Sequence, residues 1–332
     1  MHHLKSCDIG NMNGGNLYQD LNNLKGNSPT RKSDPTKQIT NCEDSLKKFI
    51  NSSSTEPDWD LSIDHLPSHI AKYENLVFVC DDFGTLSIFE ITSGGVLCNK
   101  ISTQKLNFTN IRNISVNSKY LGVTYSGLKE KDIKKYKKML PVHGICLFNR
   151  NGKNVCTDLH CFIKPSLKGG YISPRGLVLG EEHIFVADKE RQKVYKLNFD
   201  GDVIQKFKFD GRPFDISLNS KFLVATDSKS HELYLIDIEK MSLVKKITVE
   251  QVNKFEEGPH HIEITNDNLI FLNNATNTEI YLHDQNLNYK ALFSIKFCKI
   301  LNMTLLNSPN QSLIIGSKTN TNKYKLSCFI PK

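Results

Sequence analysis

The sequence has few of the features that mark membrane or secreted proteins. No stretch approaches the roughly 20 consecutive apolar residues that a membrane-spanning helix needs. The segment Met1–Gly15 has no apolar core of the kind found in signal peptides. The nine cysteines are scattered along the chain, and no two form a Cys-x-x-Cys pair. We therefore expect no membrane partner and a reducing, cytoplasmic compartment.

Common sequence patterns of catalysis are absent as well. Nothing in the chain resembles a Ser-His-Asp set, a glycine-rich phosphate loop or the Cys and His spacing of a zinc site. The segment Cys156–Cys161, which includes His160, is more typical of a strand and a turn. We therefore predict no catalytic residue, no bound metal and no cofactor.

Apolar residues are scarce at the start of the chain. Residues 1–57 are rich in Asn, Ser, Lys and Gly and contain almost no β-branched runs. Such a segment cannot bury enough surface to offset its conformational entropy. We predict a disordered N-terminal tail over 1–57 and a folded domain over 58–332.

The folded part is organised around Ser173–Phe209. This stretch reads as four short apolar strands separated by turn residues, at 176–179, 183–188, 193–199 and 203–209. Turns of this kind between apolar runs are typical of an antiparallel meander. A meander cannot bury its own faces, so it needs neighbours of the same kind.

The same pattern recurs along the chain. Asp188 ends the second strand of this unit, and Asp227 has the same place 39 positions later. Other units are indicated by strand pairs at 76–82 and 86–91, 120–125 and 144–149, 271–273 and 280–282, and 312–318 and 323–329. Six units of roughly forty residues predict an all-β fold, a six-bladed β-propeller of four-stranded antiparallel blades.

The last unit has room for only three strands before Pro331. The extended segment Trp59–Ile63 precedes the innermost strand of the first blade, which we place at His69–Tyr73. We therefore predict that Trp59–Ile63 supplies the outer strand of the last blade and closes the ring, so that no edge stays unpaired there.

One unit resembles a known repeat. It is similar to an NHL repeat, with its Pro-x-Gly start, hydrophobic-Val-Ala-Asp strand and polar turn into a basic third strand, at Ser173–Leu177, Ile184–Asp188, Lys193–Tyr195 and Asp200–Gly201. The unit at 211–249 resembles it less closely, and the others keep mainly the strand spacing. The resemblance spans 61–330 and implies a propeller like the C-terminal domain of tripartite-motif/NHL proteins, without the zinc-binding ligase modules of that group. No other unit repeats Trp59-Asp60, so the pattern of WD40 blades is absent.

The second unit departs from the common spacing. The segment at 127–142 stands in place of a turn of a few residues, and its apolar residues, spaced i, i+3, i+7, predict one face of a short helix. The other face is rich in lysine. A lysine run of this sort is usually a solvated surface. The run nevertheless lies in a loop that joins second and third strands. We therefore predict as binding residues Lys134, Lys135 and Lys138.

Binding residues are expected on one face of the propeller. The turns between second and third strands emerge on the same face as the loops that lead into the innermost strands, and such loops carry function on a rigid scaffold. Basic and aromatic residues gather in these loops, whereas acidic residues are few apart from Glu190 and Glu232. The net charge of the chain is +8. Besides the three lysines of the insertion, the predicted binding residues are Arg112, Tyr125, Arg175, Lys189, Arg191, Arg212, Phe214, Lys229, His231 and His260.

Two kinds of partner suit such a face. The resemblance implies both, since propellers of the tripartite-motif/NHL group include members that bind single-stranded RNA through a positively charged face and members that bind proteins there. Cations that meet phosphates and aromatic rings that stack on bases suit RNA. We predict a non-catalytic scaffold that binds a protein, with single-stranded RNA as the alternative and no small-molecule substrate.

An enzyme is the third hypothesis. Six-bladed propellers also serve as metal-dependent lactonases and lyases, with a metal in the central channel held by carboxylates, Asn or His. The candidates here are His69, His143, His260 and His261, but they do not recur at equivalent positions with a set of acids. Adjacent residues of a strand face opposite ways, so at most one of His260 and His261 faces the channel.

Overall fold

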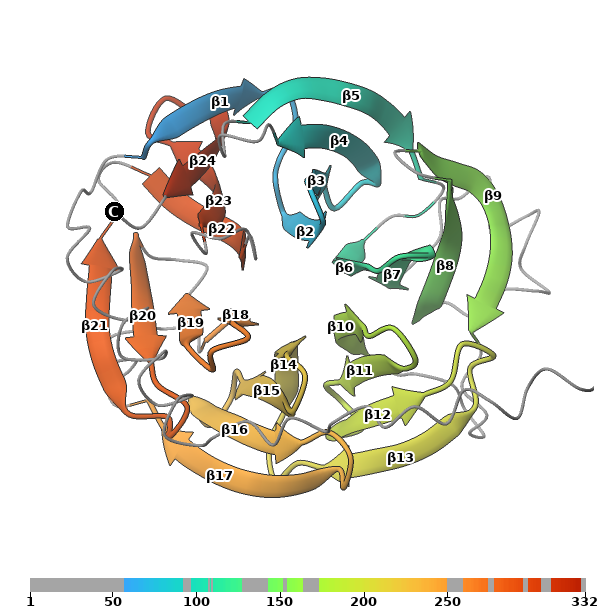
Figure 1. Cartoon of the computed structure of the whole chain (residues 1–332), viewed down its shortest axis with the longest axis vertical. Helices are drawn as coiled ribbons and strands as arrows, with labels where there is room; N and C mark the ends of the chain where they lie inside the picture. The colour runs from blue at the N-terminus through green and yellow to red at the C-terminus, as the bar shows by residue number, and fades with distance from the viewer. Residues whose placement is uncertain are drawn as a thin grey trace, which may run out of the picture.

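The computed structural model describes residues 57–91, 97–106, 108, 110–126, 143–151, 154–163, 173–249, 259–273, 278–294, 298–305 and 312–329. These residues form twenty-four strands and no helix. The strands make six four-stranded sheets, arranged as blades around a central opening (Figure 1). The predicted all-β, six-bladed propeller is therefore confirmed.

Each of the first five blades is one consecutive run of four strands, taken here from the channel outwards. Blade 1 comprises β2 (His69–Tyr73), β3 (Leu76–Cys80), β4 (Thr85–Ile91) and β5 (Leu97–Lys105). Blade 2 comprises β6 (Ile111–Val116), β7 (Tyr120–Ser126), β8 (His143–Asn151) and β9 (Asn154–Ile163). Blade 3 comprises β10 (Pro174–Leu179), β11 (Ile184–Asp188), β12 (Lys193–Leu197) and β13 (Val203–Lys208). Blade 4 comprises β14 (Pro213–Leu218), β15 (Phe222–Asp227), β16 (Glu232–Asp237) and β17 (Ser242–Thr248). Blade 5 comprises β18 (His261–Ile264), β19 (Ile270–Asn273), β20 (Glu279–His283) and β21 (Tyr289–Ser294).

Blade 6 is built from both ends of the folded domain. Its inner strands are β22 (Cys298–Leu305), β23 (Leu313–Thr319) and β24 (Tyr324–Phe329), and its outer strand is β1 (Trp59–Ile63). β1 is antiparallel to β24, from Trp59 opposite Cys328 to Ile63 opposite Tyr324. In Figure 1 the blue β1 lies beside the red β24. The predicted closure of the ring is thus confirmed.

The apolar side chains gather between neighbouring blades. In the described part of the chain there are six buried clusters, one for each pair of adjacent blades. A second strand such as β3 or β11 is buried along its whole length, because a blade lies against each of its faces. The outer strand β13 instead alternates between half-buried and exposed residues. The sequence pattern of each unit, an apolar second strand and an alternating fourth strand, follows from this difference.

The aspartate that ends a second strand closes the turn that follows it. Asp188 accepts, at Oδ1, hydrogen bonds from the backbone N–H groups of Ser173 (3.1 Å) and Arg191 (3.3 Å). Asp227 likewise accepts one from the N–H of Lys229 (2.8 Å). Both aspartates are fully buried. The carboxylates satisfy backbone donors that the sheet leaves unpaired, which is why the repeat needs Asp there.

The predicted strands of Ser173–Phe209 agree with the observed ones to within two residues. β10 begins at Pro174 rather than Gly176, and β13 ends at Lys208. The segment Cys156–Cys161 lies within β9 and contains no turn. Residues 1–56 of the predicted tail and the insertion at 127–142 lie outside the described residues.

Loss of the apolar contacts of β1 should destabilise the closed ring. Leu61 and Ile63 are half-buried and pack against the cluster between blades 6 and 1. Truncation of a fully buried Leu or Ile to Ala typically costs 2–5 kcal/mol, so the double variant Leu61→Ala/Ile63→Ala should lose about 2–4 kcal/mol of unfolding free energy. Urea denaturation measures this loss. Ser62→Ala, at the exposed position between them, is the matched control, and an equal loss in the control would contradict the closure argument.

Candidate binding face and central channel

The loop face of the propeller is the face that carries the loops into the innermost strands and the turns between second and third strands. Arg112, Arg175 and Phe214 each occupy the second position of an innermost strand, on β6, β10 and β14. His260 directly precedes β18, and Lys189 lies in the turn between β11 and β12. Because the innermost strands surround the central opening (Figure 1), these residues lie at its mouth. We call these five residues the mouth cluster.

Phe214 is the centre of the mouth cluster. The guanidinium carbon of Arg175 lies 5.2 Å, and Nζ of Lys189 5.7 Å, from the centroid of the Phe214 ring. The His260 ring stacks on Phe214, with 4.5 Å between centroids and 17° between planes. A cation–π contact contributes about 0.5–1 kcal/mol at an exposed site and more where water is excluded. The attraction of both cations to the Phe214 ring thus offsets part of the repulsion between their like charges.

Burial and mutual repulsion alter the pKa values of the mouth cluster. The pKa of Arg175 falls to about 10, first because burial disfavours its charge and then because Arg112 is near. Burial, followed by the charge of Arg175, lowers the pKa of Lys189. The pKa of His260 falls to about 4, first through burial and then through neighbouring positive charge. At neutral pH the His260 ring is therefore uncharged, while Arg175 keeps its charge.

Two other predicted cations have acidic partners. Arg191 Nε lies 3.8 Å from Oδ2 of the buried Asp188, and Arg212 Nη2 lies 3.6 Å from Glu190 Oε2. Within the described ranges, no ion pair of 4.0 Å or less joins a carboxylate to either of the cations above the Phe214 ring. The predicted cations therefore include paired residues as well as the unpaired cations of the mouth cluster.

The two arginines of the mouth cluster differ in their hydrogen bonds. Arg112 Nε donates to the hydroxyl of Ser126 at 2.8 Å. Nε of Arg175 is buried and has no hydrogen-bond partner among the described residues. A buried N–H group without a partner lowers stability.

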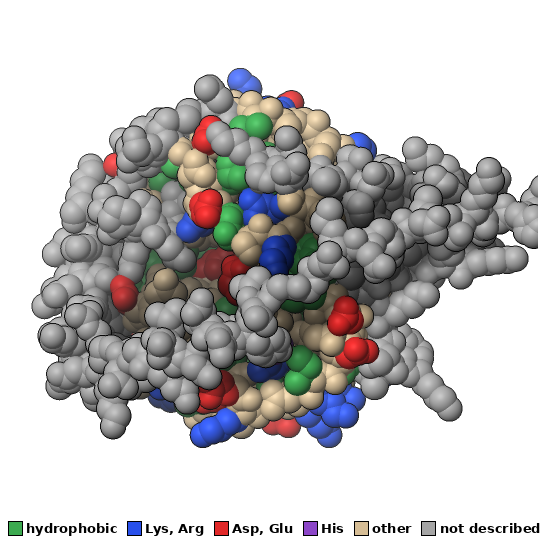
Figure 2. Space-filling view, turned by 45° about the vertical axis from the view of Figure 1, so that its right-hand side comes forward, with side chains coloured by type: hydrophobic (Ala, Val, Ile, Leu, Met, Phe, Trp, Pro, Cys, Tyr) green, Lys and Arg blue, Asp and Glu red, His purple; other side chains and the backbone are tan. Residues whose placement is uncertain are grey.

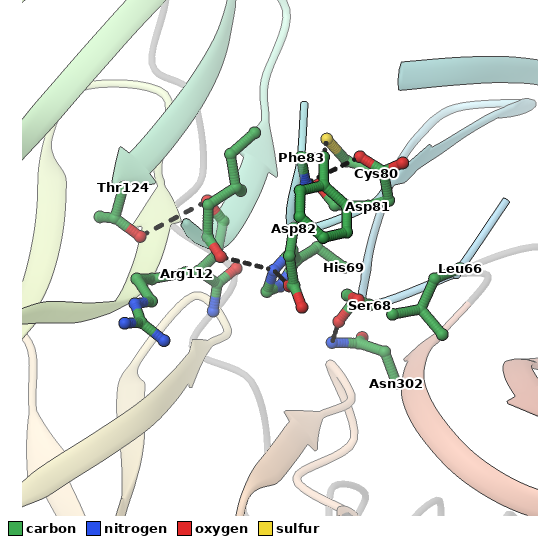
Figure 3. A network of polar contacts seen from close by, with 12 residues as sticks. Leu66, Ser68, His69, Cys80, Asp81, Asp82, Phe83, Arg112, Thr124 and Asn302 are labelled. Carbon is green, nitrogen blue, oxygen red and sulfur yellow. Dashed lines mark hydrogen bonds and ion pairs between the residues drawn. The ribbon is translucent and has the colours of Figure 1, made fainter. Parts of the chain in front are cut away.

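The loop face carries an acidic side chain, Asp82, that the sequence analysis did not name. Asp82, in the turn between β3 and β4, lies 3.0 Å from Nε2 of His69, which also lies 2.9 Å from the carbonyl oxygen of Ile111 (Figure 3). Both neighbours are acceptors, so Nε2 carries the proton. Burial acts to raise the pKa of Asp82, but hydrogen bonds, chiefly from His69, outweigh burial and lower it. The side of the molecule in Figure 2 also shows acidic and basic side chains intermixed.

Tyr125 belongs to the core and not to the binding surface that we predicted for it. Its side chain is fully buried, and its ring lies 4.5 Å from that of Phe108 between centroids. Burial raises its pKa. A Cβ atom at Gly144 would lie 2.8 Å from the Tyr125 hydroxyl, so the glycine on the neighbouring strand makes room for it. The alternation of side chains along β7 turns Tyr125 into the cluster between blades 1 and 2.

The remaining predicted residues are less informative. Lys229 is exposed and His231 is half-buried, and both lie in the turn between β15 and β16 on the loop face. The lysines of the insertion lie outside the described residues, so their role stays a prediction: Lys134, Lys135 and Lys138.

The sequence analysis missed the polar residues that line the channel below the mouth. Asp215 accepts hydrogen bonds from Asn113 Nδ2 at 2.9 Å and from the N–H of Ile262 at 3.2 Å. It therefore connects β6, β14 and β18, which belong to three different blades. The signal in the sequence was an acidic residue in a mainly apolar innermost strand, but its partners lie 102 and 47 positions away.

The two adjacent histidines face different ways, as the strand geometry predicts. His261 Nδ1 lies 3.7 Å from Oδ2 of Asp215 and 3.2 Å from Nδ2 of Asn302, so His261 faces the channel. His260 contacts Phe214 instead. Among the described residues, no three His, Cys, Asp or Glu side chains are grouped so that they could hold a metal ion. The same residues include no helix that could span a membrane.

Comparison with known proteins supports the fold. No family model and no curated protein matches the sequence. Among solved structures, the chain is similar to virginiamycin B lyase from Staphylococcus aureus, with a TM-score of 0.53 and 14% identity over 82% of this chain and 87% of that one. It is also similar to the WD40 β-propeller domain of Doa1, with a TM-score of 0.50 and 8% identity over 82% of this chain and 96% of that one. At such identities the likeness concerns the propeller fold alone.

The low pKa of His260 should make the stability of the domain depend on pH. Its folded-state pKa of about 4 lies below the ordinary value of 6.5, so the unfolded chain takes up the proton first as the pH falls. The contribution of the neutral ring is complete above about pH 6.5 and declines toward pH 4, by roughly 1–3 kcal/mol. Urea unfolding across this range should show a steeper loss in the wild type than in His260→Phe. Parallel loss in the two proteins would contradict the assignment.

Proposed function

We propose that this chain is a non-catalytic, NHL-type propeller that acts as a cytoplasmic scaffold and binds a partner protein at the mouth of its channel. The observation that carries the proposal is the mouth cluster. Arg175 and Lys189 are held close together over the ring of Phe214, with no ion pair to a carboxylate in the described chain. Rigid strands and short turns position both cations, so little entropy is lost when a partner binds.

The chemistry of the mouth favours an acidic segment of a protein. A carboxylate from a partner can form charge-assisted hydrogen bonds with the Arg175 guanidinium, which has no ion pair within 4.0 Å among the described residues. Partial desolvation of this site strengthens such a charge-assisted bond. The resemblance of 173–209 to an NHL repeat also supports this proposal, because propellers of that group include members that bind proteins through the same face.

Single-stranded RNA is the second candidate, because the mouth cluster combines cations with aromatic rings. Two observations disfavour it. Phe214 already contacts His260 and two cations, so a base would have to displace one of these contacts to stack on it. Asp82 and Glu190 also lie on the loop face, where they would repel a phosphate backbone. A protein surface carries charges of both signs, so it can be electrostatically complementary to a face that carries both acidic and basic residues.

Reversal of the two central charges should abolish binding. The double variant Arg175→Glu/Lys189→Glu should lose protein partners that co-purify with the wild type after nuclease treatment, because a change of four charge units turns attraction into repulsion. Lys206→Glu/Lys208→Glu, on the exposed side of β13, is the matched control with the same change in charge, and it should retain them. Quantitative mass spectrometry of the retained proteins measures both.

The RNA alternative is tested in the same preparation. Fluorescence anisotropy with a labelled single-stranded RNA should show little binding at physiological salt. Tight binding of RNA that weakens steeply with salt, together with partners that are lost on nuclease treatment, would replace the protein proposal with the RNA one. Equal retention of nuclease-resistant partners by both double variants would show that the mouth cluster is not the binding site.

A further inference from the structure

A cavity of about 260 Å³ lies inside the ring. The innermost strands of all six blades line it, one to several positions further along than the mouth cluster, and its lining includes no member of that cluster. Cavities that hold drug-sized ligands are roughly 300–1,000 Å³, so this one suits a smaller molecule. Its polar wall includes Lys72, Asn113, Asp215, Ser217, Glu263 and Asn302.

Lys72 is the polar group of this wall that lacks a partner. In the described part of the chain, the ammonium of this half-buried lysine forms no hydrogen bond and no ion pair within 4.0 Å. Burial lowers the pKa of Lys72, and the charge of Glu263 acts in the opposite direction from further away. Lys72 is half-buried, so its amine loses part of its hydration without gaining a partner, and this loss has a cost. The anionic group of a ligand would offset this cost.

Glu263, on β18, stands on the other side of blade 6 from this lysine, because β22 lies between β18 and β2. It accepts a hydrogen bond from the hydroxyl of Ser217 at 2.8 Å. Burial raises its pKa to about 7, with Asp215 acting in the same direction. Near neutral pH the carboxyl can therefore accept from an ammonium group or donate to a hydroxyl. Asp215 is not available in this way, since Asn113 and two backbone N–H groups already donate to it.

The cavity wall stays polar away from the mouth. Toward the far ends of the innermost strands, Ser115, Ser217 and Thr304 line the cavity. The apolar residues that alternate with them, such as Val116 and Ile264, instead pack in the clusters between blades. An anionic ligand would be attracted by the positive mouth cluster as it entered and would then meet the polar wall.

We propose that this cavity binds a small, polar organic acid with an amino or hydroxyl group next to its carboxylate. The carboxylate meets Lys72, and the amino or hydroxyl group meets Glu263. The proposal concerns a different site from the mouth cluster and does not depend on a macromolecular partner there.

The proposal is tested on the full-length chain by isothermal titration calorimetry and thermal unfolding. The probes are L-serine, L-alanine and their 2-hydroxy acid counterparts, glycerate and lactate, with the alcohol 1,2-propanediol, which lacks the carboxylate, as the negative probe. At least one acid should bind and raise Tm, and the alcohol should do neither. Lys72→Met should weaken binding by roughly tenfold or more, since one member of a close charge pair is removed. Lys206→Met, on the exposed side of β13, is the matched control and should bind as the wild type does.

A second variant separates the two polar contacts. Glu263→Gln keeps the size of the side chain and can hydrogen-bond a hydroxyl, but it cannot form a charge pair with an ammonium group. It should therefore weaken binding of the amino acids more than that of the hydroxy acids. Failure of every acid to bind the wild type would overturn the proposal. So would binding to Lys72→Met equal to that of the wild type, or, should Lys72→Met not fold, an equal effect of Glu263→Gln on both classes of acid.

Discussion

The pairing of β1 with β24 is the constraint on which the rest of the structure depends. It makes the sixth blade from two segments at opposite ends of the folded domain. Only in the closed ring do all six innermost strands surround one channel. In the closed ring, each of the six apolar clusters is built from side chains of two adjacent blades. This includes the cluster between blades 6 and 1. The mouth cluster and the cavity are consequences of closure, because each combines residues from several blades.

The channel has a definite order of chemistry along its axis. Positive charge lies at the mouth, and a polar wall of mixed charge lines the cavity beyond it. Asp215 holds the polar wall together, since it hydrogen-bonds side-chain and backbone groups of three blades. Gly176 assists this arrangement, because a Cβ there would lie 2.8 Å from the backbone N of Ile216. The innermost strands β10 and β14 can therefore approach closely beside Asp215.

The fold could be predicted because its signals are local. Asp188 and Asp227 recur because each closes a turn within its own unit, so the repeat is visible in the letters. The apolar second strands recur because every blade has neighbours on both faces. The role of Trp59–Ile63 followed from counting strands, a step that needs only the period of the repeat. None of these inferences required knowledge of which residues meet in space.

The site was predicted less completely, for a physical reason that particular residues illustrate. Arg175 and Arg191 are both basic and both lie in predicted loops, yet Arg191 lies beside a buried aspartate while Arg175 contacts Phe214. Tyr125 was expected on the loop face, but its position on β7 directs it into the core. Lys72 and Glu263 gave no signal, because each becomes unusual only when the ring brings the six strands around one cavity.

The sequence alone therefore determined the number of blades, the four strands of each and the closure of the ring, because period, strand alternation and turn chemistry act over short distances along the chain. Tertiary structure decided which cations are paired, which aromatic ring holds them and which polar groups share the channel. These depend on contacts between residues far apart in the chain, as between Asn113 and Asp215. The energy of a charge or a hydrogen bond is set by what surrounds it in space, and only the closed ring supplies those surroundings.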